Sequence, residues 1–243
     1  FANASSVKSW TVTLADQGVT RKTFAGNSSY MPAVLTWDGK DSSGEIAPEG
    51  TYVATLTVKY GKKYTQGTAK STPFILDTTR PTGKISFSPP LFSPANPSDV
   101  MTIKIDGVSD LARIESWTMY IFDPGWNLFR TYSGKWPNNT VLWDGKDMNG
   151  EVVVSAEDYP VTVKFRDEFG NMGTIQSLLP IDIIVIKDGN GYRIENSRIY
   201  FKDFTANYED VPAELAKQNI MRLNRLAETF KKYPDHKIKI VGH

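Results

Sequence analysis

Apolar and polar residues alternate along much of the chain up to about residue 187. Trp10-Thr-Val-Thr-Leu14 and Met101-Thr-Ile-Lys-Ile105 have the two-residue period of a strand with one buried face. Turn-forming sequences such as Asp16-Gln-Gly18 and Phe169-Gly-Asn171 separate these runs. Short alternating runs divided by Gly and Pro turns, with no long helical pattern before residue 210, predict a mainly β chain of antiparallel sandwiches.

The β-rich part of the chain contains an internal repeat. Trp37-Asp-Gly-Lys-Asp-Ser-Ser-Gly-Glu45 recurs as Trp143-Asp-Gly-Lys-Asp-Met-Asn-Gly-Glu151, an offset of 106 (143 − 37). Ser9-Trp-Thr11 likewise recurs as Ser116-Trp-Thr118, and Tyr52 and Tyr159 each open an alternating run. Two modules of about 100 residues follow. We place them at residues 1–80 and 81–187, because the proline of Asp77-Thr-Thr-Arg-Pro81 ends a strand.

The period changes in the last fifty residues. After a turn or linker at Asp188–Gly191, a single apolar stripe predicts a helix from Pro212 to Lys232, formed by Ala216, Ile220, Leu223, Ala227 and Phe230. Short strands at Arg198–Phe201 and Lys237–Val241 flank this helix and predict a βαβ unit. The basic residues of the helix are assigned to its solvated face, namely Arg222, Arg225, Lys231 and Lys232.

Composition lowers the expectation of several functions. Lys and Arg number 28 and Asp and Glu 27, so a net charge of +1 does not favour nucleic-acid binding. There is no cysteine and there are two histidines, His236 and His243, which leaves few residues for a catalytic base or a metal. The acids Asp203, Glu209 and Asp210 are read as helix-capping residues rather than as a hydrolase pair. We therefore expect a protein without enzymatic activity, cofactor or metal.

The sequence also indicates how the chain relates to a membrane and to export. No stretch approaches the ~20 apolar residues of a membrane span. The chain begins Phe-Ala-Asn without a charged and apolar leader, so we expect that an export signal was removed or lies outside this sequence.

The repeated Trp-Asp-Gly-Lys-Asp-x-x-Gly loop has two interpretations. Its acids and glycines suggest calcium, but in the EF-hand register with Gly150 at position 6, positions 1 and 12 are Gly145 and Ala156. The first copy places Gly39 and Gly50 there, so both copies lack two ligands. We favour a structural loop in which the Trp fills the core and Asp41 and Asp147 accept bonds from turn amides.

Two further tryptophans, Trp126 and Trp136, flank a predicted hairpin outside the repeat. Burial in the core is favoured for both, with an exposed contact for a sugar or a protein as the alternative.

The second repeat resembles the FlgD-type immunoglobulin-like repeat of exported bacterial proteins. It has both hallmarks of that family, Trp143-Asp-Gly145 and Asp167-Glu-Phe-Gly-Asn171. The first copy has Lys59-Tyr-Gly-Lys-Lys63 in place of the second hallmark and little chain before Trp10. We therefore expect a complete second sandwich and a first sandwich that is N-terminally truncated or completed by another segment.

Residues 193–243 resemble the first half of an OmpA-like peptidoglycan-binding domain. The resemblance rests on the Ile199–Tyr208 segment, the helix with Asn219, Leu223 and Ala227, and Lys231-Lys-Tyr-Pro234 leading to Gly242-His243. It implies that the diaminopimelate of the stem peptide is bound, chiefly by an aspartate just after Gly-His and an arginine on a later helix. Neither position lies within this sequence. The near wall of the pocket is assigned to Thr205, Ala206, Asn207, Gly242 and His243. A turn or capping role for Asn207 and no fixed role for His243 remain open.

These features lead to one functional expectation and one alternative. We expect a periplasmic cell-envelope protein that an OmpA-like domain anchors to peptidoglycan. Its immunoglobulin-like modules form a scaffold that can contact a protein partner. In the alternative, the OmpA-like part has diverged and the chain is a structural or protein-interaction module, with open sheet edges as its contacts.

Overall fold

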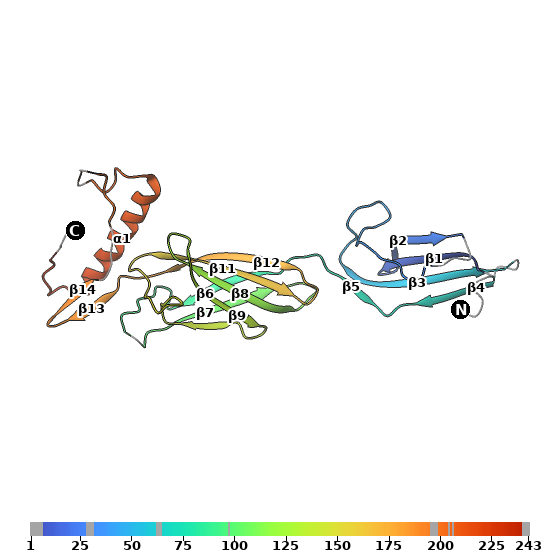
Figure 1. Cartoon of the computed structure of the whole chain (residues 1–243), viewed down its shortest axis with the longest axis horizontal. Coiled ribbons are helices and arrows are strands. Elements are labelled where there is room, and N and C mark those ends of the chain that lie inside the picture. Colours follow the sequence, from blue (N-terminus) through green and yellow to red (C-terminus); the bar gives the residue numbers. More distant parts are fainter. Residues whose placement is uncertain are drawn as a thin grey trace. The chain divides into compact units, whose positions relative to one another are not determined.

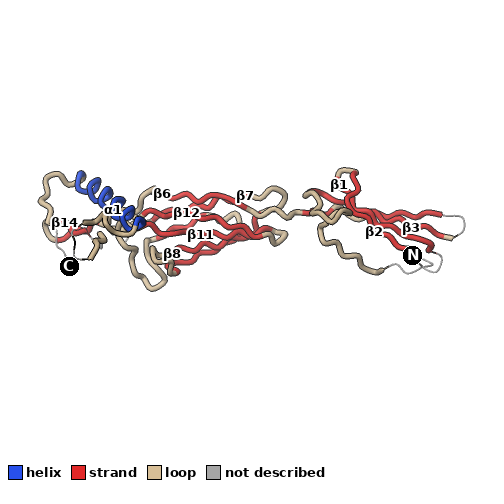
Figure 2. Tube along the Cα trace, turned by 90° about the horizontal axis from the view of Figure 1, so that it is seen from above, coloured by secondary structure: helices blue, strands red, loops and turns tan. Residues whose placement is uncertain are grey.

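The alternating segments form antiparallel strands in two successive modules. The computed structural model describes residues 7–27, 32–61, 65–96, 98–194, 199–203, 205 and 207–239. The chain divides into two compact units, Phe1–Thr79 with Asp110–Ala112, and Arg80–Ser109 with Arg113–His243. In Figure 1 the first unit is coloured from blue to cyan and most of the second unit from green to red. The mainly β prediction is confirmed, and strands dominate both units (Figure 2).

The described part of the first module is a single antiparallel sheet. Its strands are β1 (Val7–Asp16), β2 (Val19–Gly26), β3 (Gly50–Tyr60), β4 (Thr65–Lys70) and β5 (Phe74–Leu76). They are ordered β2-β1-β3-β4, and β5 pairs with the start of β3. One face of the sheet carries two small apolar clusters, around Trp10 with Val58 and around Leu14 with Tyr52.

The second module is a sandwich of two sheets. Its strands are β6 (Thr82–Ser88), β7 (Met101–Val108), β8 (Ile114–Phe122), β9 (Leu128–Lys135), β10 (Thr140–Trp143), β11 (Asp158–Asp167) and β12 (Met172–Pro180). The sheets β10-β7-β6 and β12-β11-β8-β9 contribute inward residues to one core, among them Ile103, Met119, Trp143 and Phe165. A three- and a four-stranded sheet around one core is typical of immunoglobulin-like sandwiches.

The internal repeat is visible as equivalent structure. Trp10 in β1 and Trp117 in β8 occupy matching positions, and each lies directly over a glycine of the next strand, Gly26 and Gly134. A side chain at either glycine would collide with the indole. Strands β1, β2 and β3 thus correspond to β8, β9 and β11. Strands β6, β7 and β10 have no counterpart among the described residues of the first module.

The tail of the second unit contains a hairpin and one helix. Strands β13 (Val185–Asp188) and β14 (Gly191–Ile194) pair across the turn that was expected as a turn or linker. Helix α1 (Ala213–Lys231) forms where the periodicity predicts it, directly after Pro212. The two strands expected around it do not form in the described residues, since 199–201 and 237–239 have no strand pairing. The remainder of both segments lies outside the described residues.

The buried face of α1 differs from the predicted one. Asn219, Arg222 and Thr229 are buried, whereas Ile220 of the apolar stripe is 47% exposed and Ala227 is also exposed. Periodicity identifies the apolar face of a helix, but it does not identify which face meets a neighbour in this chain. No helix in the described part of the chain has the length and apolar character needed to cross a membrane.

Candidate functional site

The residues assigned to the peptidoglycan pocket are described in part. The Thr205 hydroxyl donates to the Lys202 carbonyl at 3.0 Å and accepts from the Asn207 amide at 3.3 Å. The Asn207 side-chain oxygen accepts from the Glu209 amide at 3.0 Å. Both side chains therefore shape a turn just before α1, as the capping alternative for Asn207 states. Ala206, Gly242 and His243 lie outside the described residues.

The two Trp-Asp-Gly loops have the geometry of structural turns. The Asp147 carboxylate oxygen Oδ1 accepts from the amides of Asn149 and Glu151 at 2.7 and 2.8 Å. The indole of Trp143 is fully buried and donates to the Lys146 carbonyl at 2.9 Å. In the first copy, Asp41 Oδ1 accepts from the amides of Ser43 and Glu45 in the same way. Each aspartate thus organises its own loop, the role favoured over calcium.

The polar face of α1 attaches the tail to the second module. Arg222, 1% exposed, pairs with the buried carboxylate of Glu157, and its guanidinium lies 5.0 Å from the Tyr200 ring. Arg225 donates to Asp158 Oδ1 at 2.7 Å and to the Ile181 carbonyl at 2.8 Å. The assignment of Arg222 and Arg225 to a solvated face is therefore wrong. Periodicity could not find them because their partners precede them by 65 and 67 residues.

Asn219 fixes the segment that leads into α1. Its side-chain amide donates to the carbonyls of Tyr200 and Tyr208 at 2.6 and 2.8 Å, while its oxygen accepts from the Tyr200 amide at 2.8 Å. Tyr200 and Tyr208 are thereby held against the helix, although the described residues around them form no strand.

Trp126 is the most exposed large aromatic side chain of the second module. It lies in the turn between β8 and β9 and is 63% exposed, so its predicted core burial is wrong. Trp136 packs partly buried against the core. The turn is held by Asp123, whose carbonyl accepts from the Trp126 amide at 2.9 Å and whose Oδ1 accepts from the Asn127 amide at 2.8 Å. Trp126 has a φ of +65°, a conformation that costs a bulky residue about 1–2 kcal/mol.

Trp126 continues a row of aromatic rings on the outer face of the four-stranded sheet. The rings of Tyr120 and Phe122 are stacked with centroids 6.4 Å apart, and the Trp126 indole lies 5.8 Å from Phe122. Lys164 lies 5.6 Å from the Tyr120 ring on the same face. In the sequence, this row is indicated by the last four residues of Trp117-Thr-Met-Tyr-Ile-Phe122. All four have large apolar side chains, although successive residues of a strand point to opposite faces of the sheet.

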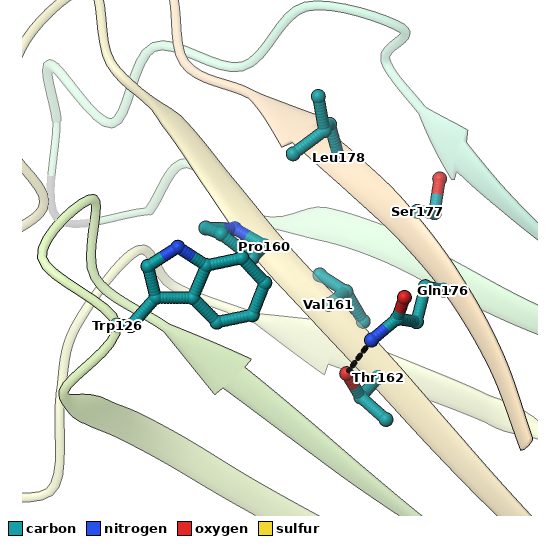
Figure 3. Close-up of a pocket in the computed structure, with 7 residues that line it drawn as sticks. All are labelled: Trp126, Pro160, Val161, Thr162, Gln176, Ser177 and Leu178. Atoms are coloured by element: carbon teal, nitrogen blue, oxygen red, sulfur yellow. Dashed lines mark hydrogen bonds between the residues drawn. The ribbon is translucent and has the colours of Figure 1, made fainter.

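Beside Trp126 the sheet surface is hollowed. The hollow has a volume of about 290 Å³ and is lined by Trp126, Pro160, Val161, Thr162, Gln176, Ser177 and Leu178. Figure 3 shows the indole next to Pro160, with Leu178 and Gln176 on the neighbouring strand β12. The Gln176 amide donates to the Thr162 hydroxyl over a long 3.4 Å. The hollow thus combines apolar surface with neutral hydrogen-bonding groups.

Fold and sites together define a mainly β protein of tandem modules with a helical tail. No family model matches the chain, and no curated protein matches it. It is similar to the solved structure of dimeric latent PorU from Porphyromonas gingivalis, at 14% identity and a TM-score of 0.33, over 73% of this chain and 16% of that one. It is also similar to a 1.5-MDa bacterial ice-binding adhesin retained on the host cell surface, at 20% identity and a TM-score of 0.36, over 72% of this chain and 54% of that one.

A third similar structure is the tetra-tandem repeat in the extending region of a large adhesion protein. It shares 11% identity and a TM-score of 0.31, over 75% of this chain and 47% of that one. The chain therefore spans less than two thirds of each of these structures.

Proposed function

We propose that this chain is part of a non-enzymatic protein of the bacterial cell envelope. Its immunoglobulin-like modules form a scaffold, and an OmpA-like domain that includes residues 193–243 tethers the protein to peptidoglycan in the periplasm. The proposal is carried by the tail sequence from Ile199 through α1 to Gly242-His243, which follows the OmpA-like pattern.

The exposure of the apolar stripe of helix α1 supports this proposal. Its polar face is occupied by Glu157 and Asp158 of the second module, while the apolar stripe with Ile220, Leu223 and Ala227 is left partly or fully exposed. An amphipathic helix of a βαβ unit covers a sheet with its apolar stripe. The sheet of an OmpA-like domain is the partner that this stripe would cover.

The ligand in this proposal is the stem peptide of peptidoglycan. Diaminopimelate is zwitterionic, so a carboxylate and a guanidinium in one pocket bind both of its charged ends, the guanidinium with two parallel hydrogen bonds. The turn formed by Thr205 and Asn207 would supply one wall of that pocket. The charged pair is expected among residues that follow His243 in the natural protein.

The proposal is tested by sedimentation with purified sacculi. The natural full-length protein should sediment with them and be released by a diaminopimelate-containing stem peptide. Retention in the pellet at about 1 mM peptide, where even a weak site is half filled, would contradict recognition of the stem peptide.

Residues 1–243 alone provide the matched control. They lack the expected charged pair, so they should stay in the supernatant. Tight sedimentation of residues 1–243 would show that the β modules, and not the tail, carry the wall contact. If the full-length protein also remains in the supernatant, the alternative of a diverged tail in a protein-interaction module is favoured.

A further inference from the structure

The outer face of the sheet β12-β11-β8-β9 differs from the equivalent face of the first module in a way that folding does not require. Tyr120 and Phe122 of β8 correspond to Thr13 and Ala15 of β1, at the offset of 107 (117 − 10) that relates Trp10 to Trp117. The pairing agrees, since Thr13 lies opposite Thr55 and Tyr120 lies opposite Thr162. The same strands therefore form in the first module with small side chains on this face.

The backbone at Trp126 also indicates selection for something other than stability. Gly and Asn adopt a positive φ at low cost, and both flank this position as Gly125 and Asn127. The chain nevertheless holds the bulky Trp126 at a φ of +65° and leaves its ring 63% exposed. Residues in costly backbone conformations concentrate at functional sites. The corresponding turn of the first module is Gln17-Gly18, which has no aromatic residue.

The chemistry of the hollow beside Trp126 selects the kind of ligand. Its surface combines the apolar groups of Trp126, Pro160 and Leu178 with the hydroxyl of Thr162 and the amide of Gln176, and no ionised side chain lines it. A pyranose ring has apolar C–H faces and a rim of neutral hydroxyl groups. An exposed indole packs against such a C–H face, while amide and hydroxyl side chains bond to the rim.

We infer that this face of the second module binds a neutral glycan chain. The Trp126 indole stacks on one sugar ring, and Gln176 and Thr162 bond to its hydroxyl groups. Phe122 and Tyr120 continue the aromatic surface along the sheet, with centroid spacings of 5.8 and 6.4 Å.

Other ligand classes fit this face less well. The hollow lies on the side-chain face of paired strands, where β11 is bonded on both sides by β8 and β12. A peptide could extend the sheet only along its edge strands β12 and β9, beside the hollow and not within it. A charged ligand would find no counter-charge among the lining residues, and Lys164 on the same face is placed over the Tyr120 ring.

Indole N–H signals in NMR spectra test the inference with residues 1–243. The chain has six tryptophans, and loss of one signal in Trp126→Asn assigns that of Trp126. Chitohexaose and cellohexaose serve as neutral probes without stem peptides, so the outcome is independent of the proposed anchoring. We expect the Trp126 signal to shift saturably with at least one of them, with half saturation below about 1 mM.

Variants separate binding from folding. Trp126→Asn should weaken binding at least about tenfold while the melting temperature stays equal or rises, because Asn suits the positive φ. Tyr120→Thr with Phe122→Ala, which copies the first module, should also weaken binding. Phe169→Asn removes an exposed aromatic from the β11–β12 turn and should leave binding unchanged.

Three results would overturn the inference. The first is that neither hexasaccharide moves the Trp126 signal. The second is a lower melting temperature for Trp126→Asn, which would make Trp126 a structural residue. The third is self-association of the chain that Trp126→Asn abolishes, which would assign this face to a contact between copies.

Discussion

At the scale of single residues, one aspartate organises each Trp-Asp-Gly loop. In the first module, Asp41 Oδ1 accepts from the Ser43 hydroxyl at 2.6 Å and from the amides of Ser43 and Glu45 at 2.8 and 3.1 Å. The hydrogen bond from the Ser43 side chain, followed by those from the backbone amides, holds the pKa of Asp41 below its usual value of 3.8. Folding and ionisation of Asp41 are therefore linked.

This linkage predicts a pH-dependent effect of Asp41→Asn. A carboxyl group whose pKa is lowered by folding stabilises the folded state above its unfolded pKa, and the effect is lost as pH falls through the folded pKa. Asp41→Asn should therefore lower the melting temperature of the first module at neutral pH. The difference from the unchanged chain should shrink once the pH drops below 3.8. Thermal unfolding between neutral pH and about pH 3 measures it.

Ser43→Ala is the matched control for this prediction. It removes the largest contribution to the lowered pKa while keeping the carboxylate. In the Ser43→Ala chain, the melting temperatures with and without Asp41→Asn should then become equal at a higher pH, closer to the usual pKa of Asp. A melting-temperature difference that is the same at pH 3 and pH 7 would contradict the linkage.

At the scale of elements, the same sequence pattern has two surroundings. Leu35 precedes the tryptophan of the first Trp-Asp-Gly loop as Val141 precedes that of the second, at the offset of 106 (141 − 35). Val141 is in β10, paired with β7, and is 8% exposed. Leu35 is in no strand and is 38% exposed, lining a hollow of about 460 Å³ with Leu14 and Trp37. The difference follows from the absence of a β7 counterpart among the described residues of the first module.

The pair Leu35→Ala and Val141→Ala measures this difference. Val141→Ala removes buried contacts and should destabilise the second module by about 1–3 kcal/mol. Leu35→Ala should change the stability of the first module by only about 0.5 kcal/mol, as at a surface position. Hydrogen exchange read by mass spectrometry reports both modules separately, because their peptides differ in sequence. Equal losses for both variants would indicate that the first module is closed like the second.

The elements could be predicted from the sequence where their signal is local. Alternation at Met101–Ile105 predicts a strand, and the repeated sequence at Trp143 predicts a loop. The five apolar residues of the stripe predict the position of α1. The face by which α1 docks could not be predicted, because it depends on Glu157 and Asp158, far away in the sequence. The exposure of Trp126 could not be predicted, because hydrophobicity does not report backbone conformation. This exposure follows from the turn held by Asp123.

At the scale of the whole molecule, ion pairs join the tail of this nearly neutral chain to its second module. Arg222, Arg225 and Lys232 of the tail pair with Glu157, Asp158 and Asp182 of the second module. Burying Arg222 is costly, since its Nε and Nη1 have no hydrogen-bond partner among the described residues. Because Arg222 is buried where Glu157 neutralises its charge, this pair contributes to which face of α1 docks, while Ile220 and Ala227 of the apolar stripe stay exposed.

Breaking the buried pair should release the tail from the second module. Arg222→Met leaves the carboxylate of Glu157 buried without a partner, a change that costs about 3–5 kcal/mol in buried pairs. We expect faster hydrogen exchange in α1, with the strands β6–β12 unchanged. Arg222→Met combined with Glu157→Leu should restore slow exchange, because apolar replacement of both partners is often neutral or stabilising.

An exposed pair on the same helix separates this effect from a general loss of charge. Lys231 and Glu228 lie 2.5 Å apart with both side chains about 70% exposed, and such pairs contribute at most about 1 kcal/mol. Lys231→Met should therefore leave the exchange of α1 nearly unchanged. If Arg222→Met also leaves it unchanged, the buried pair does not hold the tail. The docking of α1 must then come from its other contacts with the second module, those of Arg225 with Asp158 and the Ile181 carbonyl and that of Lys232 with Asp182.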